Sequence, residues 1–325
     1  MLLRIVLLVG LLGCASTRAP ASLVSGPAVD DTVTAAALGY YTSSDTNGLR
    51  GFVATAASSK SWLYHDIAAD FALLEARKAD RFDHLIAALS DRTNPAALMH
   101  LHQLWSFSWN QADYPRALSL YEGLAVDGGT NEVRAAAAYY GALLYAQTGP
   151  VDASDRLLAR LPGRLRPMVI GAFENDQGKA FDEVLGPEQS LDPKASWSGA
   201  LVDVSLRSAP LDRGGHLDLR AAMTPDTWAV AYAVSDITAA GGPAEIRLTT
   251  SDPFKVWLNG ALVGSVRRVD SMTFDGFVFP VTLQAGANRV VVKSAQRTGG
   301  WMLQARVTGP DATPIAFDET PVTAT

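Results

Sequence analysis

Residues 252–260 read DPFKVWLNG, and this stretch decides the fold of the second half of the chain. Phe254, Val256 and Leu258 alternate with Lys255 and Trp257, which is the period of a strand with one buried face. Asn-Gly directly after such a strand is the strongest short-range hairpin signal, because both residues tolerate the positive φ of a type I′ turn. We therefore predict a hairpin whose returning strand begins at 261.

Further short strands surround this hairpin, and no helical pattern interrupts them. The expected strands cover residues 228–234, 246–250, 279–283, 290–293 and 301–307. This series predicts an antiparallel β-sandwich over residues 166–309, followed by a C-terminal tail over residues 310–325.

The region before residue 166 is rich in Ala and Leu with helical spacing. Breaks such as Gly149-Pro150 fall where helices would end. The expected helices cover residues 62–78, 79–89, 95–109, a stretch beginning at 113, 133–147 and 152–161. We predict an α+β protein of more than one domain, with a helical domain over residues 32–165.

Residues 112–121 (ADYPRALSLY) and 138–149 (AYYGALLYAQTG) share a pattern of small and aromatic residues. The pattern resembles tetratricopeptide repeats, in which each helix pair leaves an apolar face that only a neighbouring pair covers. The resemblance implies a helical-repeat domain that binds a protein partner.

Three segments of the strand region carry a second resemblance: residues 252–260, 281–293 (VTLQAGANRVVVK) and 299–301 (GGW). Together they resemble a galactose-binding-like jelly-roll module, which accompanies glycosidases and cell-envelope proteins. Residues 169–175 (VIGAFEN) and Phe181, with 186–188 (GPE) and 191–192 (LD), resemble the entry to that module in large transglutaminase-like envelope proteins. Because the chain ends soon after the module, we expect no catalytic triad of the transglutaminase type.

Residues 1–14 read MLLRIVLLVGLLGC. Arg4 precedes an apolar run that is too short to cross a bilayer, which takes roughly 20 apolar residues. Residues 11–14 resemble the lipobox of bacterial lipoproteins. The resemblance implies a signal peptide over residues 1–13 and lipid attachment, such as palmitate, at Cys14. The alternative is an ordinary signal peptide with an incidental cysteine.

The segment that follows Cys14 predicts where the protein is held. Residues 14–31 are rich in Ala, Ser and Pro, a composition typical of a tether between a lipid and a domain. Ala15 is compatible with export to the outer membrane, because an aspartate in that place commonly retains such lipoproteins at the inner membrane. We therefore expect an outer-membrane, lipid-anchored protein of the cell envelope.

Composition excludes several classes of function. The 325 residues include 48% hydrophobic and 18% charged residues, one cysteine, and a net charge of -6. This balance favours packed globular structure and disfavours nucleic-acid binding, which needs a basic face. A single cysteine excludes an internal disulfide framework.

The sequence carries no motif typical of a catalytic site. No Gly-x-Ser-x-Gly elbow occurs, and His100 and His102 are two apart on a helix, so they cannot hold a metal together. Residues 174–176 (END) would suit either calcium or a plain turn. We expect no catalytic residue, no metal and no cofactor.

The candidate ligand-binding residues are aromatic and basic: Trp257, Lys255 and Trp228. Sugar recognition uses an exposed aromatic face with polar partners, and Trp257 lies opposite the apolar face of its strand. Packing between the domains is the alternative role for Trp257. We expect a non-catalytic binding or scaffolding protein with a protein partner and a possible carbohydrate ligand. The alternative is a hydrolase, or its accessory subunit, acting on envelope polysaccharide.

Overall fold

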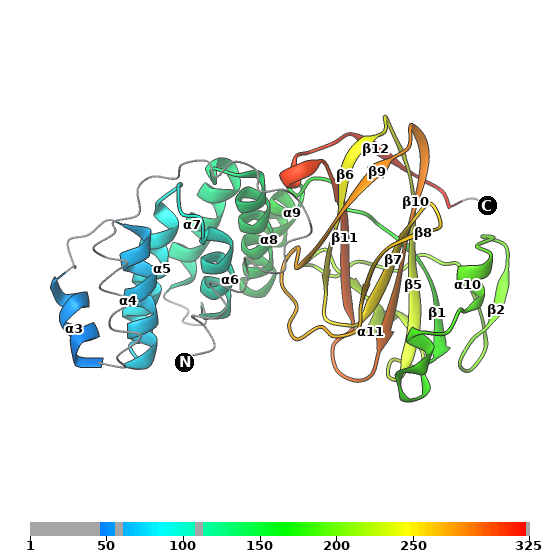
Figure 1. Cartoon of the computed structure of the whole chain (residues 1–325), viewed down its shortest axis with the longest axis horizontal. Coiled ribbons are helices and arrows are strands. Elements are labelled where there is room, and N and C mark those ends of the chain that lie inside the picture. Colours follow the sequence, from blue (N-terminus) through cyan, green and yellow to red (C-terminus); the bar gives the residue numbers. More distant parts are fainter. Residues whose placement is uncertain (1–45, 56–60, 108–112, 323–325) are drawn as a thin grey trace. The chain divides into compact units, whose positions relative to one another are not determined.

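The computed structural model describes residues 46–55, 61–107 and 113–322. The predicted signal peptide, the tether and Cys14 lie outside these residues. The chain divides into two compact units, one up to Asn94 and one from Pro95 onward. Helices precede strands, and the change falls between α9 (Val151–Leu158) and β1 (Met168–Glu174), as Figure 1 shows. The predicted α+β fold class is confirmed.

The described part of the first unit consists of α3 (Thr46–Thr55), α4 (Trp62–Leu74) and α5 (Lys78–Ser90). Ser61 begins α4 by accepting a hydrogen bond from the backbone N–H of Leu63, which satisfies one of the free donors of the first turn. The side chains that form the buried core of α3 and α4 are Leu49, Phe52, Tyr64, Ile67, Ala68 and Phe71.

The second unit opens with α6 (Ala97–Phe107), α7 (Tyr114–Asp127), α8 (Asn131–Thr148) and α9. Thr130 caps the start of α8 by accepting from the Val133 N–H, and α8 ends at Gly149, whose φ of 140° only glycine adopts readily. A Cβ at Gly141 would lie 2.9 Å from the Tyr121 Cβ, so this glycine lets α8 approach α7 closely.

The described strands form two large antiparallel sheets, which pack on each other, and a separate two-stranded sheet of β2 (Ser196–Ser198) and β3 (Asp203–Ser205). The other described strands after β1 are β4 (Leu217–Asp218), β5 (Ala229–Ala239), β6 (Gly242–Thr250), β7 (Phe254–Leu258), β8 (Ala261–Val266), β9 (Phe277–Leu283), β10 (Gly286–Gln296), β11 (Met302–Thr308) and β12 (Phe317–Thr320). One sheet has the order β1-β5-β10-β7-β8, with β12 also paired to β5, and the other has the order β4-β11-β6-β9. Phe254, Val256 and Trp301 are among the side chains that fill the core between them.

The predicted hairpin is present as β7 and β8. Leu258 pairs with Ala261 across the turn, and Asn259 and Gly260 have φ values of 51° and 79°. These are the two positive φ angles that a type I′ turn requires. Burial alternates along β7, so that Phe254, Val256 and Leu258 are buried while Lys255 and Trp257 are half-buried on the opposite face.

A segment that the sequence did not reveal covers the outer face of the β1-β5-β10 sheet. This cover segment, residues 175–207, contains η1 (Asp176–Phe181), α10 (Gly186–Gln189) and the β2–β3 hairpin. Its Phe181 and Leu191 pack with Val230 and Tyr232 of β5 in a second hydrophobic cluster. Residues 229–237 of β5 are therefore buried on both faces of the sheet.

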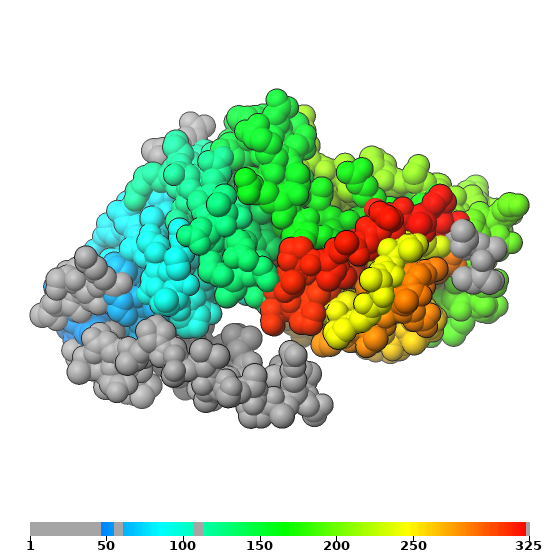
Figure 2. Space-filling view, turned by 90° about the horizontal axis from the view of Figure 1, so that it is seen from above, coloured from blue at the N-terminus to red at the C-terminus, as the bar shows by residue number. Residues whose placement is uncertain are grey.

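The helices of the second unit are joined to the sandwich by backbone hydrogen bonds. Leu165 N–H donates to the Ala305 carbonyl at 2.9 Å, and Val307 N–H donates to the Gly163 carbonyl at 2.8 Å. The chain end contributes β12, which pairs with β5. Figure 2 shows these last residues, in red, lying along the surface of the sandwich.

Candidate ligand-binding site

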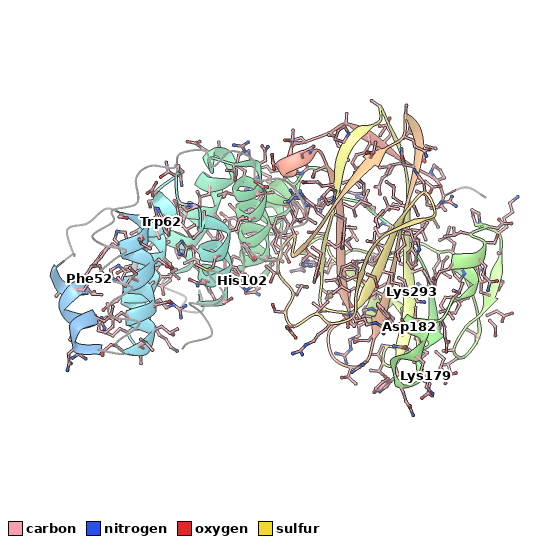
Figure 3. All side chains as sticks on the ribbon, viewed as in Figure 1. Phe52, Trp62, His102, Lys179, Asp182 and Lys293 are labelled. Atoms are coloured by element: carbon pink, nitrogen blue, oxygen red, sulfur yellow. The ribbon has the colours of Figure 1, made fainter. Side chains whose placement is uncertain are left out.

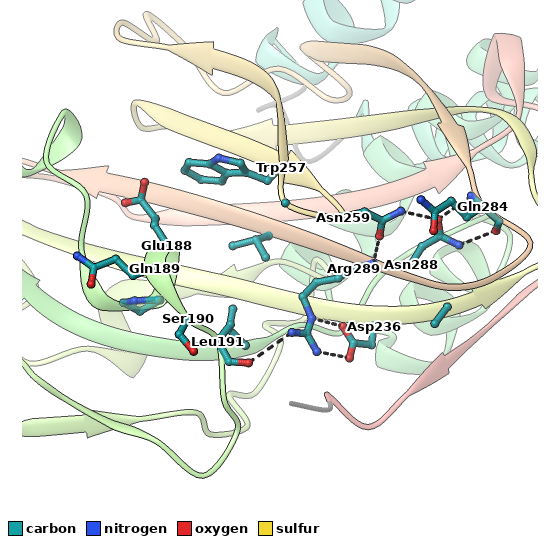
Figure 4. Close-up of a pocket in the computed structure, with 14 residues that line it drawn as sticks. Glu188, Gln189, Ser190, Leu191, Asp236, Trp257, Asn259, Gln284, Asn288 and Arg289 are labelled. Atoms are coloured by element: carbon teal, nitrogen blue, oxygen red, sulfur yellow. Dashed lines mark hydrogen bonds and ion pairs between the residues drawn. The ribbon is translucent and has the colours of Figure 1, made fainter. Parts of the chain in front are cut away.

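A cavity of about 560 Å³ opens where the cover segment ends on the sheet. It lies over the outer face of β5, β10 and β7 and is bounded on one side by α10 and residues 189–191 (Figure 4). The lining residues used below are Glu188, Leu191, Asp236, Trp257, Asn259 and Arg289. The cavity therefore combines one large aromatic ring with several polar side chains.

Trp257 forms the aromatic wall of the cavity. The alternation of β7 turns its indole away from the core, which Phe254 and Val256 fill from the other face. The cover segment does not enclose this ring, because Trp257 stays half-buried while Tyr232 on β5 is fully buried. An indole in this position offers a ligand an apolar surface.

Asp236 and Arg289 form the charged floor of the cavity. The two residues are direct partners across β5 and β10. Arg289 Nε donates to Asp236 Oδ1 at 2.6 Å and Arg289 Nη2 donates to Oδ2 at 2.7 Å, a bidentate pair, while Nη1 donates to the Leu191 carbonyl at 3.4 Å. The side chain of Arg289 exposes only 11% of its surface and that of Asp236 only 9%. This bidentate pair, the Asp236–Arg289 fork, is therefore held in one geometry beside the cavity.

Amide side chains fix the turns at the end of the cavity near the β7–β8 hairpin. Asn259 Oδ1 accepts from the Arg289 N–H at 2.8 Å, and Asn259 Nδ2 donates to Asn288 Oδ1 at 3.0 Å. Asn288 is buried and also accepts from the Gln284 N–H at 2.8 Å. These bonds tie the β7–β8 turn to the β9–β10 turn, so this wall of the cavity is preformed.

The opposite wall is held by a buried charge pair beneath α10. Lys293, which Figure 3 labels, is fully buried. Its Nζ donates to Glu188 Oε1 and to the Glu183 carbonyl, both at 2.7 Å. Tyr232 donates its hydroxyl to the same Glu188 oxygen at 2.5 Å. Burial lowers the pKa of Lys293, against the opposing effect of Glu188. Burial, together with the bond to Glu188, raises the pKa of Tyr232, so its hydroxyl keeps the proton that it donates.

The three predicted ligand-binding residues do not lie at one site in the structure. Trp257 lines the cavity. Lys255 lies on the same face of β7, but its Nζ sits 5.0 Å from the centre of the Phe181 ring, where it contacts the cover segment. Trp228 lies just before β5, is 44% exposed, and is not among the residues that line the cavity. Its backbone is hydrogen-bonded to the backbones of Asn175 and Arg297.

Two important site residues were missed in the sequence. Asp236 interrupts an apolar stretch of β5, and this buried charge was an available signal. Its partner Arg289 lies 53 residues later and meets it only through the register of β10 on β5. The sequence carries no local mark of that register.

A second cavity of about 520 Å³ lies between α6, α8 and the loop before β9. Its apolar rim includes Leu98 and Val278, which are 46% and 39% exposed. Its floor includes Arg247, which is paired with Glu245 and Asp275. His102 lines it as well and lies 3.1 Å from the Tyr140 hydroxyl, and burial lowers the pKa of His102.

Two buried side chains and the half-buried Asp212 connect α8 to the sandwich in an order that resembles a catalytic relay. The Tyr139 hydroxyl lies 2.7 Å from His216 Nε2, and His216 Nδ1 lies 3.1 Å from Asp212 Oδ2. Because an ionised carboxylate only accepts, Nδ1 is the donor and Nε2 accepts from the tyrosine. Tyr139 and His216 expose 1% and 2% of their surface, so the chain serves packing between α8 and the sandwich.

Residues 174–176, for which calcium and a turn were both open, lie at the junction where β1 ends at Glu174 and η1 begins at Asp176. Asn175 is buried and donates through Nδ2 to the Gln296 carbonyl at 3.0 Å, while Asp176 pairs with Lys179. Within the described ranges, no three or more His, Cys, Asp or Glu side chains gather into one group that could hold a metal ion. No helix in the described part of the chain has the length and apolar character to span a bilayer.

No family model and no curated protein matches this chain. Among solved structures, the PA14 domain of the antifreeze protein MpAFP is similar over 25% of this chain and 44% of its own, with 14% identity and a TM-score of 0.23. The β-glucosidase of Kluyveromyces marxianus in complex with glucose is similar over 44% of this chain and 15% of its own, with 11% identity and a TM-score of 0.27. The chain thus spans less than half of either protein. These distant likenesses identify no family: the chain is a helical region followed by antiparallel β-sheets.

Proposed function

We propose that this chain is a non-catalytic binding protein that holds a saccharide in the cavity beside Trp257. The observation that carries the proposal is an indole facing the same cavity as the Asp236–Arg289 fork. A pyranose ring has an apolar C–H face and a rim of hydroxyl groups. The indole suits the first and the charged fork suits the second, because hydroxyls both donate to carboxylates and accept from guanidinium groups.

The charges around the cavity favour a neutral sugar. Asp236 is neutralised by Arg289, and Glu188 is neutralised by Lys293. An acidic saccharide would bring a carboxylate to a site without a surplus positive charge, and it would lose part of its hydration there. Neutral hexose or N-acetylhexosamine units are therefore the expected ligands.

Titration of the full chain with neutral oligosaccharides and with peptidoglycan fragments tests this proposal. Calorimetry should show saturable binding to at least one of them. Trp257→Ala should weaken that binding roughly tenfold or more, because the aromatic face is lost. Trp228→Ala is the matched control, since it removes a partly exposed tryptophan outside the cavity lining.

Two outcomes would contradict the proposal. One is the absence of saturable binding to any of these saccharides by the unaltered chain. The other is equal weakening by Trp257→Ala and Trp228→Ala, which would mean that the cavity is not the binding site.

The same proposal includes an attachment to the outer membrane and a protein partner. Support for the attachment comes from the lipobox-like residues 11–14, with Cys14 as the lipid-bearing residue. Support for the partner comes from the resemblance of the helices to tetratricopeptide repeats and from the apolar rim of Leu98 and Val278 on the second cavity. The protein then works as an anchored module that brings a glycan and a partner together.

A further inference from the structure

Two histidines that are distant in sequence meet in the first unit. His65 on α4 and His84 on α5 are 19 residues apart, and their Nδ1 atoms lie 3.1 Å from each other. The ring centres are 5.4 Å apart and the rings are tilted by 38°. The two side chains are half-buried, so solvent and small ions can reach them.

A buried tyrosine holds both rings in place. Tyr64 is 2% exposed, and its hydroxyl donates to the Val53 carbonyl at 2.9 Å. The edge-on contacts of its ring have centre-to-centre distances of 5.1 Å to His65 and 5.9 Å to His84. The imidazoles are therefore fixed from one side by the core and open on the other.

The separation of the two nitrogens fits two ligands on one metal ion. At a metal–nitrogen distance of 2.0–2.1 Å, as for zinc, nitrogens 3.1 Å apart subtend an angle of about 100° at the metal. That angle lies between those of square-planar or octahedral and tetrahedral coordination. Coordination geometries with such angles are common for copper, nickel and zinc bound by imidazole.

We propose that His65 and His84 bind a divalent transition-metal ion through their Nδ1 atoms, with water completing its coordination. Each Nδ1 must lose its proton or offer its lone pair, and the hydrogen bond between the rings is replaced by two metal–nitrogen bonds. The ring that donates this hydrogen bond releases its Nδ1 proton to solvent while its Nε2 takes one up, so both imidazoles stay neutral and each Nδ1 offers a lone pair.

The charges that face the pair are compatible with a bound cation. Asp80 and Asp83 on α5 act on His84 in favour of positive charge, and Arg77 acts against it. Arg77 is itself paired with Asp80. Burial lowers the pKa of both histidines and so favours the neutral imidazole, which is the form that binds a metal ion.

Metal titration of the full chain tests the site directly. The chain carries Cys14→Ser so that no thiol competes, and it is purified without a polyhistidine tag. Calorimetry with Zn²⁺, Ni²⁺ and Cu²⁺ should show one saturable site, with Cu²⁺ bound most tightly. His65→Ala and His84→Ala should each weaken Zn²⁺ binding at least tenfold, whereas His102→Ala should not, because His102 pairs with Tyr140 instead.

A measurement on the unaltered histidines guards against loss of folding in the variants. Imidazole nitrogen resonances of the full chain should change on addition of Zn²⁺ for His65 and His84 and stay unchanged for His100, His102 and His216. Absence of saturable binding, binding that survives in both alanine variants, or zinc-dependent shifts at other histidines would each overturn the proposal.

Discussion

At the scale of single residues, Trp257 shows how position decides the role of a side chain. Trp257 lies on β7 and Trp301 directly precedes β11, yet Trp301 is fully buried and donates its indole N–H to Ser294 at 2.8 Å. Trp257 occupies the outward register of β7 and remains half-buried at the cavity. The alternation of the strand, rather than the residue type, makes one ring a core residue and the other a candidate ligand contact.

A second prediction at the scale of single residues concerns Cys14. When the chain is expressed in a bacterial host, metabolic labelling with palmitate should label the unaltered chain, and Cys14→Ala should abolish the label because the chain has no other thiol. The label is measured on the immunoprecipitated protein after removal of free lipid. Ser25→Ala, altered in the same region, serves as the control and should keep the label. Equal labelling of unaltered and Cys14→Ala chains would contradict lipid attachment at this residue.

At the scale of elements, the cover segment is what turns a plain sheet face into a cavity. Its α10 is a single short helix and depends on contacts with the sheet. Glu188 of α10 receives hydrogen bonds from Lys293 and Tyr232, and Leu191 adds an apolar contact. These few contacts position one whole wall of the cavity.

Lys293→Met should therefore destabilise the second unit by about 3 kcal/mol, because it leaves the Glu188 carboxylate without its cation near the protein interior. The double variant Lys293→Met with Glu188→Gln should cost less than the single variant, since the introduced amide is neutral and its oxygen could still accept from Tyr232. Guanidinium unfolding at pH 7, followed by tryptophan fluorescence, measures both values. A double variant that is less stable than Lys293→Met would show that the pair is not coupled in this way.

The elements differ in how far the sequence could predict them. Helices such as α8 and strands such as β7 were predicted because their apolar periods are local and their ends carry Gly149 or Asn259-Gly260. The cover segment was missed because its buried residues, such as Phe181 and Leu191, are isolated and follow no period. At the site, Trp257 was found from alternation within one strand. Asp236 and Arg289 meet only through a strand pairing, which no local pattern encodes.

At the scale of the whole molecule, the second unit is held together by polar chains as well as by apolar packing. Tyr139 of α8 reaches His216 and Asp212 of the sandwich, and Arg306 of β11 donates to the Pro162 carbonyl at 2.8 Å. Buried polar groups are costly when a partner is lost. The junction between helices and sheets should therefore be sensitive to single substitutions.

Asp212 makes this sensitivity measurable as a function of pH. Burial alone would raise the pKa of Asp212, but the hydrogen bonds from His216 and Gly214 outweigh burial and lower the pKa below its ordinary value. A depressed carboxyl pKa adds stability above about pH 4, and that stability is lost as the pH falls through the folded-state pKa.

Asp212→Asn should consequently lower the free energy of unfolding at pH 7 by about 1–3 kcal/mol and flatten its dependence on pH below about pH 4. Urea unfolding of the full chain at a series of pH values tests this. Asp203→Asn, which alters an exposed aspartate on β3, should leave the curve unchanged. An unaltered pH profile in Asp212→Asn would refute the role assigned to this carboxylate.

The segment between α9 and β1 determines where a soluble fragment that contains the sandwich can begin. Through Gly163 and Leu165 it is bonded to β11, beyond the short partner strand β4. A fragment that begins at residue 166, where helices give way to strands, would leave Ala305 and Val307 on an open edge. Open edges invite pairing with other chains and aggregation. A soluble fragment of the sandwich should therefore begin upstream of Gly163, so the autonomous piece is larger than the run of strands itself.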